Sequence, residues 1–326
     1  MSNFGGPNSQ FEIDLRTRLK PLYSRMDRLE IKLQNLINES IRNANRSITY
    51  WNTVTREIDD IYLQMNKVFA SWSETSIPWR YRRSISLLQS RIENSKAILN
   101  IAKRGIVDLL NSRISTQIMH SLYTSAIESF ANASLLGRRN LYNLIRLTQQ
   151  NLIKESLINL TVGTGFDLGD LRKAAKTIES QLWSRLMTQV ENKQFVQAGR
   201  YHYTPRYYSE LVARTKFHEA HSNAARTQCA NYNTDLIQVS THNTKTEVCQ
   251  DFEGKIFSIS GKDLRFPPLT WSPPYHPNCL HLEFPTFESA MVQQGSLDSF
   301  SAFSLGNIDR PPLPSGFIPL AKRIAV

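Results

Sequence analysis

The sequence contains little cysteine and no long apolar run. Three cysteines in 326 residues are too few, and an odd number, for a disulfide framework, and they fit a reducing compartment. No stretch approaches the roughly 18 consecutive apolar residues of a membrane span. The first residues, MSNFGGPNSQFEIDLRTR, have no apolar core, so we expect no secretory signal. These absences favour a chain that works in a reducing compartment without a membrane span.

The sequence also lacks the well-marked motifs of hydrolases and nucleotide-binding proteins. There is no Gly-x-Ser-x-Gly and no Cys/His pair at nucleophile spacing. The Gly-x-Gly of VGTGFDLGD (162–170) follows no predicted strand and precedes no Lys-Ser/Thr, so it is no phosphate-binding loop. HEAH, from His218 to His221, separates its histidines by three positions rather than the four of HExxH. We interpret these histidines as polar residues on an amphipathic helix.

The charge is basic and lies mainly in the first half of the chain. The net charge is +11, and residues 1–160 hold 22 Lys and Arg against 13 Asp and Glu. Residues 161–326 are nearly balanced, with 17 against 15. Such an excess suits contact with nucleic acid or an acidic protein surface. Because no dense Lys/Arg run exists, a solvated helical surface with an incidental bias remains the alternative.

Apolar residues recur at helical spacing through most of the first 195 residues. The stripes include Leu22, Met26, Leu29, Leu33, Val54, Ile58, Ile61 and Met65. We therefore predict a mainly α protein with an elongated helical domain over 11–195, preceded by a flexible start at 1–10. The segment SETSIPWRY (73–81), with Pro78, is expected to interrupt the helical pattern.

The pattern changes near Gly199, and a small α+β module is predicted over residues 199–286. One last helix is expected from about Pro205 to Asn231, and Arg214 on it is expected to pair with an acid such as Glu219. Three short β-like runs follow, at 236–240, 255–260 and 280–284. Residues 287–326 are rich in Ser, Pro and Gly, so we expect an extended tail that orders only against a partner.

Metal-ligating residue types gather in this predicted module. They are His242, Cys249, His276, Cys279 and His281. Zinc prefers four N or S ligands, and a module with three short strands has little core of its own, so a metal staple makes physical sense. In the alternative, both cysteines are small buried hydrophobes and the histidines are surface residues.

A metal held by these residues is expected to be structural rather than catalytic. A catalytic zinc needs an open coordination position and a general base. Glu253 and Glu283 lie nearby in the sequence, but nothing marks either of them as a base. Cys229 lies at a polar helix end and is expected to be inert.

The second half of the chain resembles a known family. The stretches that carry the resemblance are YYSELVARTKFHEAHSNAARTQ, DLIQVSTH, CQDFEGKIFSISG and HPNCLH, in this order. Together they resemble the phage minor capsid protein 2 family, which is akin to the Mu-type and Bacillus-phage head morphogenesis proteins. The resemblance covers about residues 199–285, and the helical first half carries no matching motif.

The sequence departs from the family pattern at two positions. Thr246 stands where the family has the first cysteine of a Cys-x2-Cys knuckle, and Leu280 replaces an arginine in the closing motif. Full family-type zinc ligation would then need a fourth ligand. His242, or both histidines of the closing motif, would have to supply it; otherwise the loop is held by packing without a metal.

The resemblance implies a non-enzymatic virion component. Such proteins enter the procapsid in a few copies, lie near the portal vertex inside the head, and influence head assembly and genome passage. The implied partners are the portal, the capsid interior and packaged DNA, with Lys and Arg of residues 16–146 as candidate contacts; no small-molecule substrate is expected. Two alternatives remain: a metal-dependent nuclease or toxin-type enzyme on the same scaffold, and a free basic DNA-binding protein.

Overall fold

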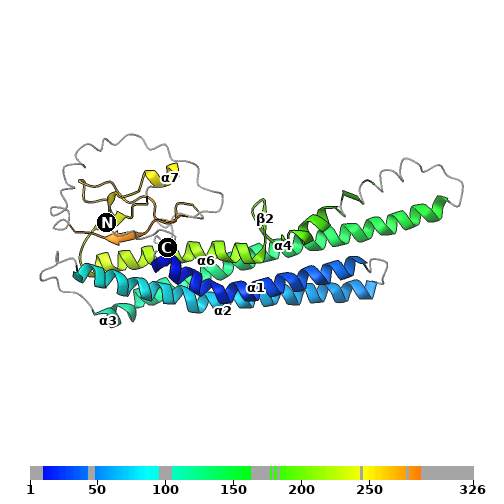
Figure 1. The fold of residues 1–326 in the computed structure, drawn as a ribbon, viewed down its shortest axis with the longest axis horizontal. Coiled ribbons are helices and arrows are strands. Elements are labelled where there is room, and N and C mark those ends of the chain that lie inside the picture. Colours follow the sequence, from blue (N-terminus) through cyan, green and yellow to red (C-terminus); the bar gives the residue numbers. More distant parts are fainter. Residues whose placement is uncertain are drawn as a thin grey trace. The chain divides into compact units, whose positions relative to one another are not determined.

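The computed structural model describes residues 10–42, 48–94, 105–162, 177, 180–181, 184–242, 245–276 and 279–287. It is 71% helix and 8% strand, with a small sheet in the C-terminal part (Figure 1). The mainly α class and the small β-containing module predicted from the sequence are thereby confirmed. The predicted flexible start and extended tail lie almost wholly outside the described residues.

Five helices account for most of the described chain. They are α1 (Gln10–Arg42), α2 (Ile48–Asn94), α3 (Ile106–Leu110), α4 (Arg113–Val162) and α6 (Pro205–Asn231). The apolar stripes are buried as the periodicity predicts, and their fully buried members include Leu15, Leu19, Leu22, Met26, Leu33, Ile58 and Met65. Among the described helices, none combines the length and the apolar character needed to cross a membrane.

The expected interruption at residues 73–81 is wrong. Helix α2 continues through Pro78 without a break. Proline cannot donate the backbone hydrogen bond to the carbonyl four residues earlier, so it costs stability at this position. The neighbouring side chains of Ile77 and Tyr81 are fully buried. Their burial offsets the lost hydrogen bond, which local sequence rules do not take into account.

The chain folds into two compact units, each assembled from separate segments. The first unit contains Met1–Arg18, Ser73–Ala126 and Ala213–Val326. The second contains Leu19–Trp72 and Ile127–Val212. Helices α1, α2, α4 and α6 each contribute residues to both units. The predicted boundary between domains 11–195 and 199–286 stays a prediction.

In the second unit, a β-hairpin that the sequence patterns did not indicate lies against α4. Strands β1 (Val196–Ala198) and β2 (Tyr201–Tyr203) pair antiparallel, and Gly199 turns between them with a φ of +59°. The segment before β1 is fixed by Tyr62, whose hydroxyl donates to the Phe195 carbonyl at 2.6 Å. Gly137 of α4 allows this close approach, because a Cβ there would lie 2.1 Å from the Phe195 oxygen.

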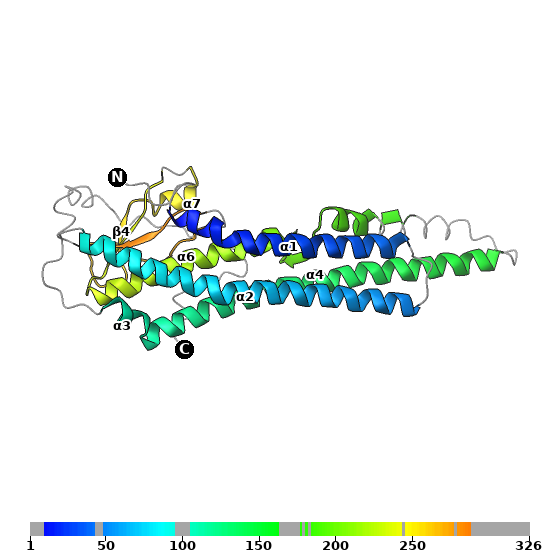
Figure 2. The same cartoon turned by 60° about the horizontal axis from the view of Figure 1, so that its bottom comes forward.

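In the first unit, parts of four helices pack side by side (Figure 2). The Tyr81 hydroxyl of α2 lies 3.1 Å from the Ser115 hydroxyl of α4 and 2.9 Å from the Thr227 hydroxyl of α6. Arg80 of α2 reaches Asp14 of α1 at 3.4 Å. These contacts hold together helical segments that are far apart in the sequence, in the unit that also contains the small sheet.

The sheet of the first unit has three antiparallel strands. They are β3 (Leu236–Val239), β4 (Ile256–Ser258) and β5 (Glu283–Pro285), in the order β4-β3-β5. The first two runs predicted from the sequence contain β3 and β4, whereas the third strand begins three residues later than expected. Residues 280–282 instead lead into the ladder, where the Leu282 carbonyl accepts from the Ser240 backbone N–H at 2.9 Å.

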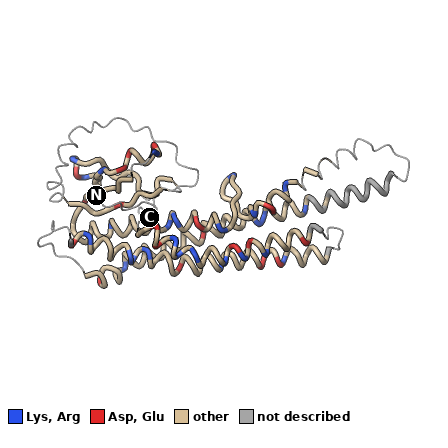
Figure 3. The backbone as a smooth tube through the Cα atoms, in the orientation of Figure 1, with Lys and Arg blue, Asp and Glu red and all other residues tan. Residues whose placement is uncertain are grey.

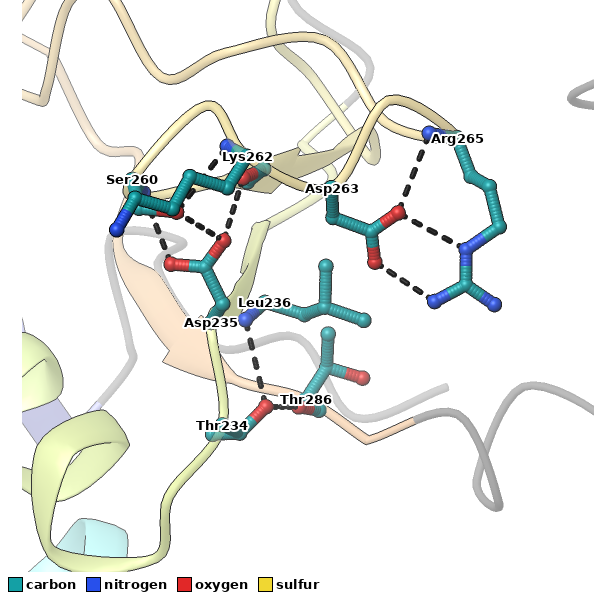
Figure 4. Close-up of polar contacts among 9 residues, drawn as sticks. Thr234, Asp235, Leu236, Ser260, Lys262, Asp263, Arg265 and Thr286 are labelled. Carbon is teal, nitrogen blue, oxygen red and sulfur yellow. Dashed lines mark hydrogen bonds and ion pairs between the residues drawn. The ribbon is translucent and has the colours of Figure 1, made fainter.

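A polar network fixes the ends of this sheet and the loop after β4 (Figure 4). The Asp235 carboxylate accepts from the backbone N–H and from the hydroxyl of Ser260, both at 2.8 Å, and from the Ser258 hydroxyl. Thr234, the residue before Asp235, donates from its hydroxyl to the carbonyl of Thr286, just after β5, at 2.7 Å. These hydrogen bonds therefore fix the start of the loop that runs from β4 to the closing HPNCLH motif.

Candidate metal centre

Two short turns of the first unit carry the cysteines that the sequence singled out. Cys249 lies in α7 (Glu247–Gln250), a single helical turn closed by the Cys249 N–H bonding to the Thr246 carbonyl at 3.0 Å. His276 and Cys279 lie in the closing loop, where the Cys279 N–H bonds to the His276 carbonyl at 3.0 Å. In each turn, a backbone hydrogen bond thus helps to hold the cysteine in place.

The two turns bring one imidazole and two thiols together. The ligand atoms of Cys249, His276 and Cys279 all lie within 4.8 Å of one another. Both cysteines are 0% exposed. Sulfur and nitrogen are the donors that zinc prefers, and structural zinc sites use four of them, so these three residues fit a zinc ion that a fourth ligand would complete. The structure therefore brings together three of the five residues that the sequence singled out, in a cluster that could hold a metal ion.

The surroundings of the cluster favour a thiolate. A hydrogen bond from the Cys249 thiol, and a second from His281, lower the pKa of Cys279. The same hydrogen bond and burial raise the pKa of Cys249. Aromatic rings flank the cluster: Tyr275 stacks on Phe252 with ring centroids 4.3 Å apart. The hydrogen bonds to the Cys279 sulfur thus outweigh the burial that would raise its pKa, and the deprotonated sulfur is the form that binds a metal.

The two remaining predicted ligands lie next to the cluster but do not join it equally. His281 Nδ1 is 3.5 Å from the Cys279 sulfur. His281 is nevertheless not one of the three residues whose ligand atoms all lie within 4.8 Å of one another. His242 instead places its Nε2 2.7 Å from the Ser240 hydroxyl. Its ring packs edge-on against His281, with centroids 4.7 Å apart. The geometry therefore favours His281 over His242 as the fourth ligand.

The sequence interpretation made the HEAH histidines polar residues on an amphipathic helix; the structure places them on α6 and buries both. His218 and His221 are 1% and 3% exposed. His218 Nδ1 lies 3.2 Å from the His281 carbonyl, and His221 Nε2 lies 3.0 Å from the Glu283 carbonyl. Both histidines therefore contact the backbone that leads from the closing loop into β5, which tethers α6 to the small sheet.

The expected pairing of Arg214 with Glu219 is also wrong. Arg214 forms a two-pronged pair with Glu12 of α1, and Glu219 pairs with Lys216 at 2.7 Å. Sequence spacing on one helix suggested Glu219, whereas the tertiary fold brings a carboxylate from α1 into reach. Cys229 is buried, and burial raises its pKa, in keeping with an inert thiol.

A scan against protein-family models, a search of curated proteins and a search of solved structures each find no match. The fold and site define a mainly α protein with a small antiparallel sheet and a Cys-His-Cys cluster formed by two buried cysteines and the half-buried His276.

Proposed function

We propose that this chain is a minor capsid protein of a tailed phage, a prophage or a gene transfer agent. In this role it lies at the portal vertex inside the head and influences procapsid assembly and DNA packaging or ejection. It acts as a structural component and turns over no substrate. The host cytoplasm is its location during assembly, and the virion is its final location.

One observation carries the proposal. The Ala-Arg-Thr part of α6, strand β3, the Cys249 turn and the closing HPNCLH turn all belong to the first unit. The stretches that resemble the phage family are therefore parts of one folded body, and their cysteines and His276 share one site. If the four stretches resembled the phage family only by chance, there would be no reason to expect them in the same folded unit.

We propose zinc as the ion of the Cys-His-Cys cluster, with His281 completing the ligand set. Bound zinc would join α7 to the closing loop and thereby stabilise a sheet whose strands are only three or four residues long. The full burial of both cysteines suits this stapling role better than catalysis, which needs an open position for a substrate.

The portal and packaged DNA are the proposed partners. Lys and Arg alternate with Asp and Glu along the helices rather than forming one block (Figure 3). Several arginines of the basic half have partners within the chain: Arg138 pairs with Asp59 at 2.7 Å and Arg80 with Asp14 at 3.4 Å. Contact with DNA would therefore draw on the remaining basic side chains of residues 16–146.

Peptide mass spectrometry of gradient-purified particles from the source host tests the virion role. We expect the chain at a few copies per particle in both procapsids and DNA-filled heads. A strain carrying Cys279→Ser serves as the matched variant, and we expect its particles to contain less of the chain. If the wild-type chain is found only in the soluble fraction, the proposed role is wrong.

A further inference from the structure

His281 lies between a cysteine of the cluster and a carboxylate. Its Nδ1 is 3.5 Å from the Cys279 sulfur, and its Nε2 is 3.6 Å from Oε1 of Glu253. The His281 side chain is 2% exposed, and the Glu253 side chain is 11% exposed. Among the described residues Nε2 has no hydrogen-bond partner, and its distance to the Glu253 carboxylate is too long for a closed hydrogen bond.

Metal binding would complete this contact. If Nδ1 gives its lone pair to a metal, the neutral ring carries its proton on Nε2. Glu253 is then the acceptor that faces this N–H, and a shift of about half an ångström brings the two atoms to hydrogen-bond distance. A carboxylate behind a ligating histidine fixes the tautomer and the orientation of the ring.

Glu253 is itself held in place from the strand side. Its carboxylate accepts a hydrogen bond from the backbone N–H of His242, just beyond β3. Its own N–H bonds to the Cys249 carbonyl at 3.0 Å, one turn after the cysteine. The next residue, Gly254, has a φ of +74° and bonds to the Val239 carbonyl at 3.1 Å. The carboxylate therefore connects the Cys249 turn, the end of β3 and His281.

We propose that Glu253 is a positioning residue of the metal centre. It holds the Nε2 proton of His281 and keeps Nδ1 turned toward the two cysteines. This inference rests on the proposed zinc site, but it does not depend on the virion role. The loss of such a carboxylate typically lowers metal affinity by about 10- to 100-fold.

The test compares the full-length chain with Glu253→Gln and with the control Glu247→Gln. Glu247 is an exposed acid two positions before Cys249, so its variant removes the same charge from the same turn. Zinc affinity is measured by competition with a chromophoric chelator. Long-range ¹H–¹⁵N spectra of histidine-labelled protein report which ring nitrogen of His281 binds zinc.

We expect the wild type to bind one zinc, with Nδ1 of His281 on the metal and a proton on Nε2. Glu253→Gln should bind zinc about 10- to 100-fold more weakly, while Glu247→Gln matches the wild type. Equal affinity in Glu253→Gln, or zinc on Nε2, would overturn the inference. If the wild type binds no zinc, both this inference and the metal centre are wrong, whereas the virion role is decided separately by the particle analysis.

A second measurement separates positioning from simple support of the turn. Thermal unfolding of the metal-free proteins should give similar midpoints for the wild type and Glu253→Gln, because the Gln amide oxygen still accepts from His242. A large loss of stability without metal would show that Glu253 acts by holding the turn, and it would overturn the positioning role.

Discussion

Arg214 of α6 holds the carboxylate of Glu12 of α1 with two hydrogen bonds, at 2.8 and 3.1 Å. The two residues are 202 positions apart in the sequence. Their side chains are 14% and 4% exposed, so the pair is largely removed from water. Through it the Ala-Arg-Thr stretch, which carries part of the family resemblance, binds the first turn of the chain's first helix.

Glu12→Gln should destabilise the protein strongly. The substitution takes from the largely buried Arg214 a carboxylate that it holds with two hydrogen bonds, and losing one partner of such a pair typically costs about 3 kcal/mol. Urea unfolding measures the change, and Glu57→Gln, which removes an exposed acid from α2, serves as the control with an expected change below about 0.5 kcal/mol. Equal stability of the two variants would contradict a structural role for the pair.

The same pair predicts a dependence on acid. Burial raises the pKa of Glu12, but the hydrogen bonds and charge of Arg214 outweigh burial and lower it below the usual 4.5. The stabilisation is therefore full above pH 4.5 and is lost as the pH falls through the lower folded value. The stability difference between the wild type and Glu12→Gln should shrink in this acid range. A difference that stays constant down to pH 3 would count against the pair.

His221 should make the protein less stable in mild acid. Burial, followed by the charge of Arg80, holds its pKa well below 6.5, and Arg80 Nη2 lies 3.3 Å from its Nδ1. Its other described contacts are uncharged: the Ser84 hydroxyl, the Phe11 and Phe284 rings and the Glu283 carbonyl face the imidazole, with His218 and Arg91 nearby.

Because the unfolded chain takes up the proton first, the free energy of unfolding should fall below pH 6.5. The slope from this one group is about 1.4 kcal/mol per pH unit. Urea unfolding between pH 7 and 5 measures it, and His221→Gln should lose that part of the slope. Identical slopes in both proteins would show that His221 is protonated in the folded state.

Gly137→Ala should destabilise the second unit. In an ordinary helix the change gains about 1 kcal/mol. Here the new Cβ would lie 2.1 Å from the Phe195 oxygen and 2.9 Å from the Val196 Cα, both backbone atoms. We expect a net loss of about 1–3 kcal/mol in urea unfolding. Gly105→Ala is the control, because its nearest neighbour lies 3.7 Å away; a gain at Gly137 would contradict the close crossing.

Cys279→Ser should loosen the metal-binding module and leave the second unit intact. The change removes a sulfur from the shared cluster, so a bound metal loses a ligand and the short strands lose their staple. Hydrogen exchange should become faster in β3, β4 and α7 but stay unchanged in the hairpin of β1 and β2. Unchanged exchange in both regions would show that packing alone holds the module.

The sequence predicted the features that depend on interactions between residues close together in the chain. Helix α6 runs from Pro205 to Asn231 as expected, because Pro205 suits a first helical position and the residues after Asn231 leave the helical pattern. The Cys and His residues on two predicted turns were chosen as candidate ligands from their spacing, and three of the five lie together in the structure. These features depend on neighbours in the chain.

Tertiary contacts decided the rest. The continuation of α2 through Pro78 depends on burial of its flanking side chains, and the partner of Arg214 comes from another helix. The contact of Glu253 with His281 joins residues whose spacing shows no motif. Sequence periodicity reports only neighbours along the chain, so it cannot predict contacts between residues that are far apart in the sequence.

We propose that Cys249, Cys279, His276 and His281 hold one metal ion, and the zinc content of the purified chain is the decisive measurement. The full-length protein, expressed and purified without chelators, is analysed by inductively coupled plasma mass spectrometry beside Cys279→Ser. The account predicts one zinc per wild-type chain and a clear loss in the variant. A metal-free wild-type chain that still melts cooperatively would contradict it.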